Sequence, residues 1–105
     1  MENRGLFEID GNLYTLKFNM DKVKQIETLL DISFTSEVAK TGGILSFRLL
    51  EALFSVGLYD ANDEKSVKGK KAQDIYNSLL ENEGYMKVAE VALAKVEDDL
   101  GFLFR

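Results

Sequence analysis

Apolar and polar positions alternate with a period of two over residues 5 to 18, GLFEIDGNLYTLKF. Such alternation is typical of a strand with one buried side, and glycine followed by asparagine is typical of a tight loop. The pattern predicts a β-hairpin with Gly11 and Asn12 as its loop. In this register the apolar side chains of one face lie opposite one another in two pairs: Ile9 with Tyr14, and Phe7 with Leu16.

After the hairpin, apolar residues recur with the three- and four-residue spacing of one face of an α-helix. Residues 20 to 32 predict a short amphipathic helix with Asn19 or Asp21 as its N-cap. Residues 33 to 43 are interpreted as a connector, because two consecutive glycines near its end interrupt helical structure. Two apolar residues are expected to anchor this connector: Phe34 and Val38.

The second half of the chain predicts two more helices, at residues 71 to 83 and 85 to 100. They are separated by Gly84, since glycine is favoured where a helix ends. The preceding residues 60 to 71, DANDEKSVKGKK, are almost all charged or small and predict a surface loop.

Residues 44 to 58, ILSFRLLEALFSVGL, predict a helix with two apolar faces. The first face has five members: Leu45, Leu49, Ala52, Leu53 and Val56. The second face has four: Phe47, Leu50, Phe54 and Leu58. A polar stripe suited to water separates them on one side: Arg48, Glu51 and Ser55. The other predicted helices have one apolar face each, so we expect this helix at the centre of a small bundle.

These elements predict a mainly helical α+β fold, in which an N-terminal β-hairpin packs on a bundle of about four helices. The 105 residues are long enough for one domain, 1 to 105, which buries roughly two thirds of its unfolded surface.

The chain contains no cysteine and no histidine. It therefore lacks thiolate metal ligands, the commonest general base near neutral pH, and every Ser-His or Cys-His nucleophile pair. We expect no enzymatic activity, catalytic residue, metal site or cofactor.

The loop at residues 60 to 71 has some features of a calcium or phosphate site. It begins like an EF-hand loop, but Lys65 and Lys71 occupy the places of the required glycine and glutamate. Its lysines suggest nucleic acid as an alternative partner, but neighbouring acidic residues and a net charge of −5 oppose that interpretation. The first residues do not resemble a signal peptide, and no apolar run is long enough to span a bilayer. We expect a cytoplasmic protein that binds neither nucleic acid nor membrane.

Apolar surface is the remaining candidate for function. Complete burial contributes about 1.5 to 3 kcal/mol for each large side chain of the second helix face, so something must cover it. Either the hairpin or the last helix covers this face, or the face is kept for a partner, as is the C-terminal segment GFLFR. The candidate partner-binding residues are Phe47, Leu50, Phe54, Leu58, Phe102 and Phe104.

Three segments in this order carry a family resemblance: FEIDGNLYTLKFNMDKVKQIE, LSFRLLEALFSVGLYD and GYMKVAEVALAKVEDDL. The chain resembles the tail assembly chaperones of siphophages and prophages of Gram-positive bacteria. The resemblance implies a small helical protein of the host cytoplasm that coats the tape measure protein and gives way as tail tube subunits polymerise. It also implies a longer frameshifted form that recruits the tail tube protein, with this chain as the shorter product.

Two other classes of function are compatible with the sequence. One is a small non-enzymatic interaction protein or oligomeric structural protein that uses the same apolar surface. The other is a nucleic-acid-binding regulator that uses the lysine-rich loop. Self-association is expected in the chaperone and in the oligomeric protein.

Overall fold

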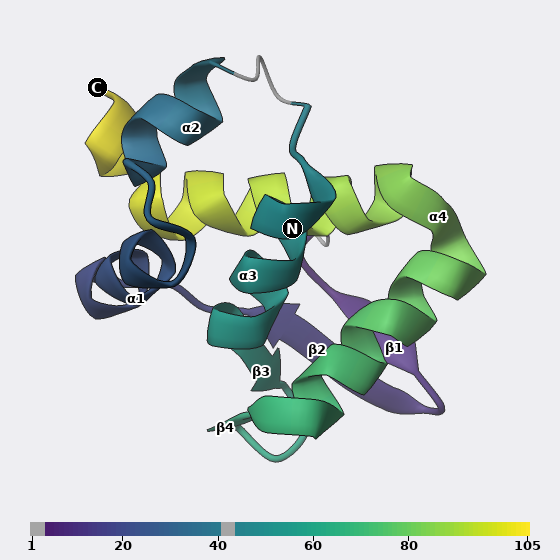
Figure 1. Ribbon diagram of the computed structural model, residues 1–105. Coiled ribbons are helices and arrows are strands. Elements are labelled where there is room, and N and C mark those ends of the chain that lie inside the picture. Colours follow the sequence, from purple (N-terminus) through teal and green to yellow (C-terminus); the bar gives the residue numbers. More distant parts are fainter. Residues whose placement is uncertain (1–3, 41–43) are drawn as a thin grey trace.

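The structure is a computed structural model that describes residues 4–40 and 44–105 (Figure 1). It has an α+β fold in which helices pack around one small antiparallel sheet, as the sequence predicts. The sheet has the strand order β1 (Phe7–Ile9), β2 (Asn12–Leu16), β3 (Leu58–Asp60) and β4 (Lys65–Ser66). The helices are α1 (Met20–Leu30), α2 (Phe34–Lys40), α3 (Phe47–Gly57) and α4 (Gly69–Leu100), followed by the short 3-10 helix η1 (Gly101–Phe104).

The predicted hairpin is present, but its predicted register is wrong by two residues. Ile9 pairs with Asn12, so the loop consists of Asp10 and Gly11, whose φ angles are 51° and 82°. Two consecutive positive φ angles are what a two-residue hairpin loop requires, and Asp-Gly supplies them. A shift of two positions leaves every side chain on its original side of the strand. The predicted apolar face is therefore confirmed, and its residues are buried: Phe7, Ile9, Tyr14 and Leu16.

Strands β3 and β4 extend this hairpin into a four-stranded sheet, which the sequence pattern did not reveal. The sequence placed Leu58 at the end of a helix, but its backbone is extended and it pairs with Leu16 of β2. The residues interpreted as a surface loop contribute Asp60, which pairs with Tyr14, and Lys65 of β4. The pairing of β3 with β2 satisfies backbone N–H and C=O groups along the edge of β2 that the hairpin alone would leave unpaired.

The segment interpreted as a connector contains a helix, α2. A side-chain oxygen of Glu27 accepts a hydrogen bond of 2.7 Å from the Phe34 N–H at the start of this helix. Phe34 is fully buried and Val38 packs against the core, so the prediction that these residues anchor the segment is confirmed. The predicted break at Gly42 and Gly43 lies outside the described residues.

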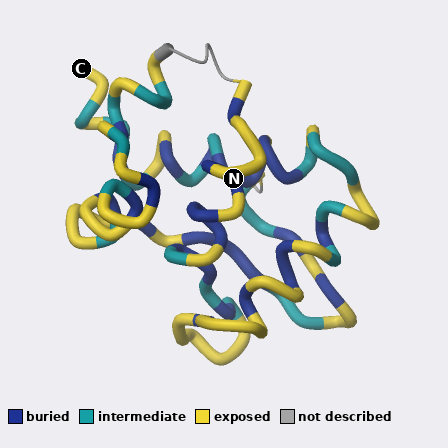
Figure 2. The backbone as a smooth tube through the Cα atoms, in the orientation of Figure 1, coloured by how far each residue is buried: buried dark blue, intermediate teal, exposed yellow. Residues whose placement is uncertain are grey.

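Helix α3 lies at the centre of the fold, as predicted, between α1, α4 and the sheet (Figures 1 and 2). It begins at Phe47 because the Ser46 hydroxyl caps it, accepting a hydrogen bond of 3.1 Å from the Leu49 N–H. It ends at Gly57, one residue before the predicted boundary.

Helix α4 consists of two helical stretches joined at Gly84, where the sequence predicted a helix end. Gly84 has φ 86° and ψ 175°, which breaks the helix and turns the chain sharply (Figure 1). The first stretch begins at Gly69, two residues before the predicted start. The hydroxyl of Tyr85 donates a hydrogen bond of 2.7 Å to the Leu45 carbonyl and so ties the second stretch to the chain before α3.

Most of the buried apolar residues form one continuous cluster that draws on the hairpin, all four helices and the segments between them. None of the helices in the described ranges combines the length and the apolar character that a bilayer-spanning helix needs.

Candidate protein-binding surface

Half of the predicted partner-binding residues are buried in the structure. Leu50, Phe54 and Leu58 are buried in the core, where a partner cannot reach them in this conformation. The Phe54 ring lies 5.9 Å from the ring of Phe7 in the hairpin and 5.2 Å from that of Tyr76 in α4, between ring centroids. The hairpin and the first stretch of α4 therefore cover this face of α3. The sequence left cover by the hairpin open, but the helix it named as the other candidate was the last one, at residues 85 to 100, whereas Phe54 meets Tyr76 of the preceding stretch.

Phe47 belongs to the same helix face but remains 57% exposed. Its ring makes an edge-to-face contact with Tyr85, with 5.5 Å between the centroids. Ile44, three residues earlier, is also largely exposed, as is Met86, which follows Tyr85. We call Phe47 and Tyr85 the kink patch, because their rings meet where the start of α3 adjoins the kink of α4.

The last aromatic residues form a second exposed group in η1. Phe102 is 50% exposed and Phe104 is 41% exposed. Phe104 lies against α2, with its ring centroid 6.4 Å from that of the buried Phe34. We call Phe102 and Phe104 the tail patch. It is accessible to a partner, as the sequence-based hypothesis requires.

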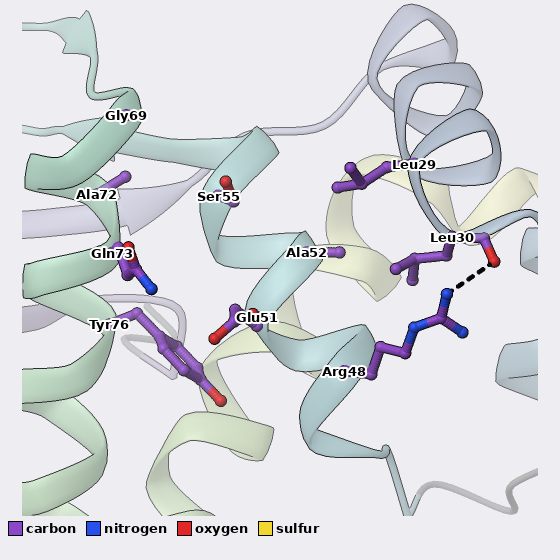
Figure 3. A pocket seen from close by; sticks show the side chains of 10 residues that line it. All are labelled: Leu29, Leu30, Arg48, Glu51, Ala52, Ser55, Gly69, Ala72, Gln73 and Tyr76. Atoms are coloured by element: carbon purple, nitrogen blue, oxygen red, sulfur yellow. Dashed lines mark hydrogen bonds between the residues drawn. The ribbon is translucent and has the colours of Figure 1, made fainter.

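A groove of about 480 Å³ runs over α3 between α1 and the start of α4 (Figure 3). Its floor contains the stripe that the sequence assigned to water: Arg48, Glu51 and Ser55. Its walls come from α1 and α4: Leu29 and Leu30 on one side, and Gly69, Ala72, Gln73 and Tyr76 on the other. The groove could not be predicted from the sequence because residues of three separate helices line it. The spacing of residues within one helix does not indicate how three helices pack together.

The two sides of the groove carry opposite charge. The guanidinium of Arg48 points toward α1, where it donates a hydrogen bond of 3.3 Å to the Leu30 carbonyl (Figure 3). The carboxylate of Glu51 points toward Tyr76 of α4 (Figure 3). Burial, and then the charge of Glu51, raise the pKa of the Tyr76 phenol. Within the described residues Glu51 has no ion-pair partner.

Asp60 and its neighbours, which resemble the start of a calcium-binding loop, have a structural role in the β3–β4 turn. Asp60 is buried, and its carboxylate accepts hydrogen bonds of 2.9 Å from the N–H groups of Asn62 and Asp63. The Asp63 N–H is the main cause that lowers the pKa of this carboxyl, against the opposing effect of burial. Across residues 4–40 and 44–105, no three Asp, Glu, His or Cys side chains are grouped so that they could hold a metal ion.

The lysines of the same region are partly balanced by acidic neighbours. Lys70 lies 3.2 Å from a carboxylate oxygen of Asp74, and Lys65 lies 4.0 Å from one of Asp63. These exposed pairs reduce the positive field that a phosphate backbone would meet.

In comparisons with protein families, curated proteins and solved structures, no match to this chain is found.

Proposed function

We propose that this chain is a tail assembly chaperone, which binds and solubilises the tape measure protein during phage tail morphogenesis in the cytoplasm of the host bacterium. The proposal includes no enzymatic step and no cofactor. The observation that carries it is the kink patch, in which Phe47 is more than half exposed although Leu50 and Phe54 of the same helix face are buried. The choice of family rests on the resemblance carried by the three sequence segments quoted above.

An exposed aromatic residue on a firmly packed element suits the binding of apolar helices. The edge-to-face contact with Tyr85 restricts the Phe47 ring, and the Tyr85 hydroxyl is itself held by the Leu45 carbonyl. Covering the exposed half of one phenylalanine contributes about 1 kcal/mol, which is weak for a single site. A rod-like client offers many such sites, so linked copies bind it much more tightly than one copy does.

The tail tube protein is a second partner in this proposal. A longer, frameshifted form of the chain would recruit it, while the form described here would cover the tape measure protein. Polymerising tube subunits would then replace the chaperone along the client.

The direct test is co-expression with a tape measure protein whose gene lies beside the gene for this chain. We expect the client to stay in the soluble fraction with the wild-type protein and to precipitate without it. Phe47→Ser should reduce the soluble fraction at least severalfold, because it removes the apolar contact and keeps the fold.

Met20→Ser is the matched control, since Met20 is an exposed apolar residue at the start of α1. It should leave the soluble fraction unchanged. A client that precipitates equally with and without the wild-type protein would overturn the proposed function.

A further inference from the structure

We propose that the kink patch binds an amphipathic client helix whose apolar stripe is flanked by lysine or arginine. This inference rests on the proposed function, because it names the chemistry of the client that the same patch would bind. The two remain separable, since a client without basic flanks would satisfy the proposed function and contradict the inference.

The apolar surface at this corner is wider than the two rings of the kink patch. Ile44 is 74% exposed and Met86 is 77% exposed, which makes them the most exposed large apolar side chains among the described residues. Met86 follows Tyr85 in the chain, and the Tyr85 hydroxyl donates its hydrogen bond to the carbonyl of Leu45, next to Ile44. Apolar residues of two separate segments therefore meet at the kink. An amphipathic helix covers such a surface with apolar side chains from successive turns.

The charged residues beside this apolar surface are mainly acidic. Glu81 and Glu83 are exposed in the last turn of the first stretch of α4, just before the kink at Gly84 (Figure 1). Within the described residues neither carboxylate has an ion-pair partner. Glu90 is also exposed, one helical turn after Met86 and on the same face of the second stretch. The corner thus combines apolar surface with unpaired carboxylates.

The kink prevents Glu83 from being neutralised within the helix. Glu83 and Lys87 are four residues apart, a spacing that favours an ion pair on a continuous helix. Gly84 interrupts the helix between them, and Lys87 lies 3.9 Å from a carboxylate oxygen of Glu90 instead. Residues 72 to 94 contain no basic residue other than Lys87. The cation that would neutralise Glu83 is therefore missing from this part of α4.

The helix adds negative potential at the same place. The C-terminal end of an α-helix carries a partial negative charge, which a nearby cation stabilises and a nearby carboxylate destabilises. Glu81 and Glu83 therefore lie where they reduce the stability of the first stretch. The guanidinium of Arg48, which follows Phe47, points away toward α1 and donates a hydrogen bond to the Leu30 carbonyl (Figure 3). A lysine or arginine of a bound helix would relieve the repulsion at this helix end.

The test is an NMR titration of the isotope-labelled full chain with two synthetic amphipathic helical peptides. Both peptides have the same leucine stripe, which is flanked by lysines in one and by glutamates in the other. We expect the lysine peptide to bind about tenfold more tightly, and this difference to shrink as added salt screens the charges. The largest shifts of amide signals should lie at residues 44–48 and 81–90.

Charge reversals determine which residues select the peptide. Glu83→Lys should weaken binding of the lysine peptide about threefold, and adding Glu81→Lys should bring the loss to about tenfold, because like charges then face each other. Both variants should bind the glutamate peptide more tightly than wild type does. Phe47→Ser should weaken the binding of both peptides alike, because it removes apolar contact and changes no charge.

Asp98→Lys is the matched control. Asp98 is exposed in the last turn of the second stretch, so its reversal changes the net charge and the charge at a helix end as Glu83→Lys does. It lies about 20 Å along the helix axis from Tyr85, at 1.5 Å per residue. The control should change the affinity for either peptide by less than about twofold. The spectrum of each variant without peptide shows that the fold is kept.

Equal affinity of the wild-type protein for the two peptides would overturn the inference. A preference for the lysine peptide that survives the double reversal would do the same. Co-expression separates these results from the proposed function. If the double variant keeps the tape measure protein as soluble as wild type does, the inference fails and the proposed function stands. If the peptides are distinguished but the client precipitates with and without wild type, the proposed function fails and the preference for basic helices stands.

Discussion

The ring of Phe18 lies directly against Gly57, the last residue of α3. A Cβ atom added at Gly57 would stand 2.5 Å from Cε1 of Phe18, closer than real Cβ contacts allow. The backbones meet here too, since the Lys17 N–H donates a hydrogen bond of 2.8 Å to the Gly57 carbonyl. This close approach allows the chain entering α1 to pass the end of the central helix.

Gly57→Ala should therefore destabilise the fold by about 1 to 3 kcal/mol, because the added methyl group has no space. Urea unfolding followed by circular dichroism measures this change. Phe18→Leu in the same chain should recover part of the loss, since it removes the ring atoms that the methyl group meets. Gly101→Ala is the control: it has open space and a helical backbone, and it should be neutral or slightly stabilising. Equal stability of Gly57→Ala and wild type would show that the contact is not tight.

Gly84→Ala should cost about 1 to 2 kcal/mol, because residue 84 has a positive φ that a Cβ atom disfavours. Space is not the cause, since no atom lies within 4 Å of an added Cβ. Gly84→Asn should cost less, because asparagine tolerates positive φ better than other residues with a side chain do. The same unfolding measurement decides this. A more stable alanine variant would indicate that the helix can run straight through the kink.

Phe54→Ala should destabilise the protein by about 3 to 5 kcal/mol, since it leaves a cavity among fully packed side chains. Phe102→Ala should cost less than about 1 kcal/mol, because half of its side chain is already in water. The midpoints of thermal unfolding of the two variants, each compared with wild type, distinguish a core residue from an exposed one. A similar loss of stability in both variants would contradict the assignment of Phe54 to the core and of Phe102 to the exposed surface.

Asp60 should make stability fall in acid. Its pKa in the folded protein lies below the ordinary value of 3.8, so its contribution is complete above that value and is lost as pH falls through the folded pKa. Asp60→Asn keeps an oxygen that can accept the Asn62 and Asp63 N–H groups but does not titrate. The variant should show a smaller change in urea midpoint than wild type between neutral pH and about pH 3. A parallel pH dependence in both proteins would exclude this carboxyl as a cause.

Several features were predictable because they depend on nearby residues. The period-two pattern identified the buried hairpin face, and the helical spacing located α1, α3 and both stretches of α4. Gly84 marked the kink because the preference for positive φ belongs to the residue itself. The two apolar faces of α3 predicted its central position, since a helix buried on both faces needs neighbours on both.

Other features depend on where distant residues meet. The hairpin register, strands β3 and β4 and helix α2 were missed or misplaced, because short strands and a seven-residue helix acquire their stability from tertiary packing. Sequence alone determined that the chain carries a second apolar face on α3 and an aromatic tail. Tertiary structure decided that the hairpin and α4 cover most of that face, and that Phe47 and the tail remain exposed. The physical reason is that periodicity shows which side chains are apolar and share a face. Only the neighbours that pack against that face determine which of these side chains are buried.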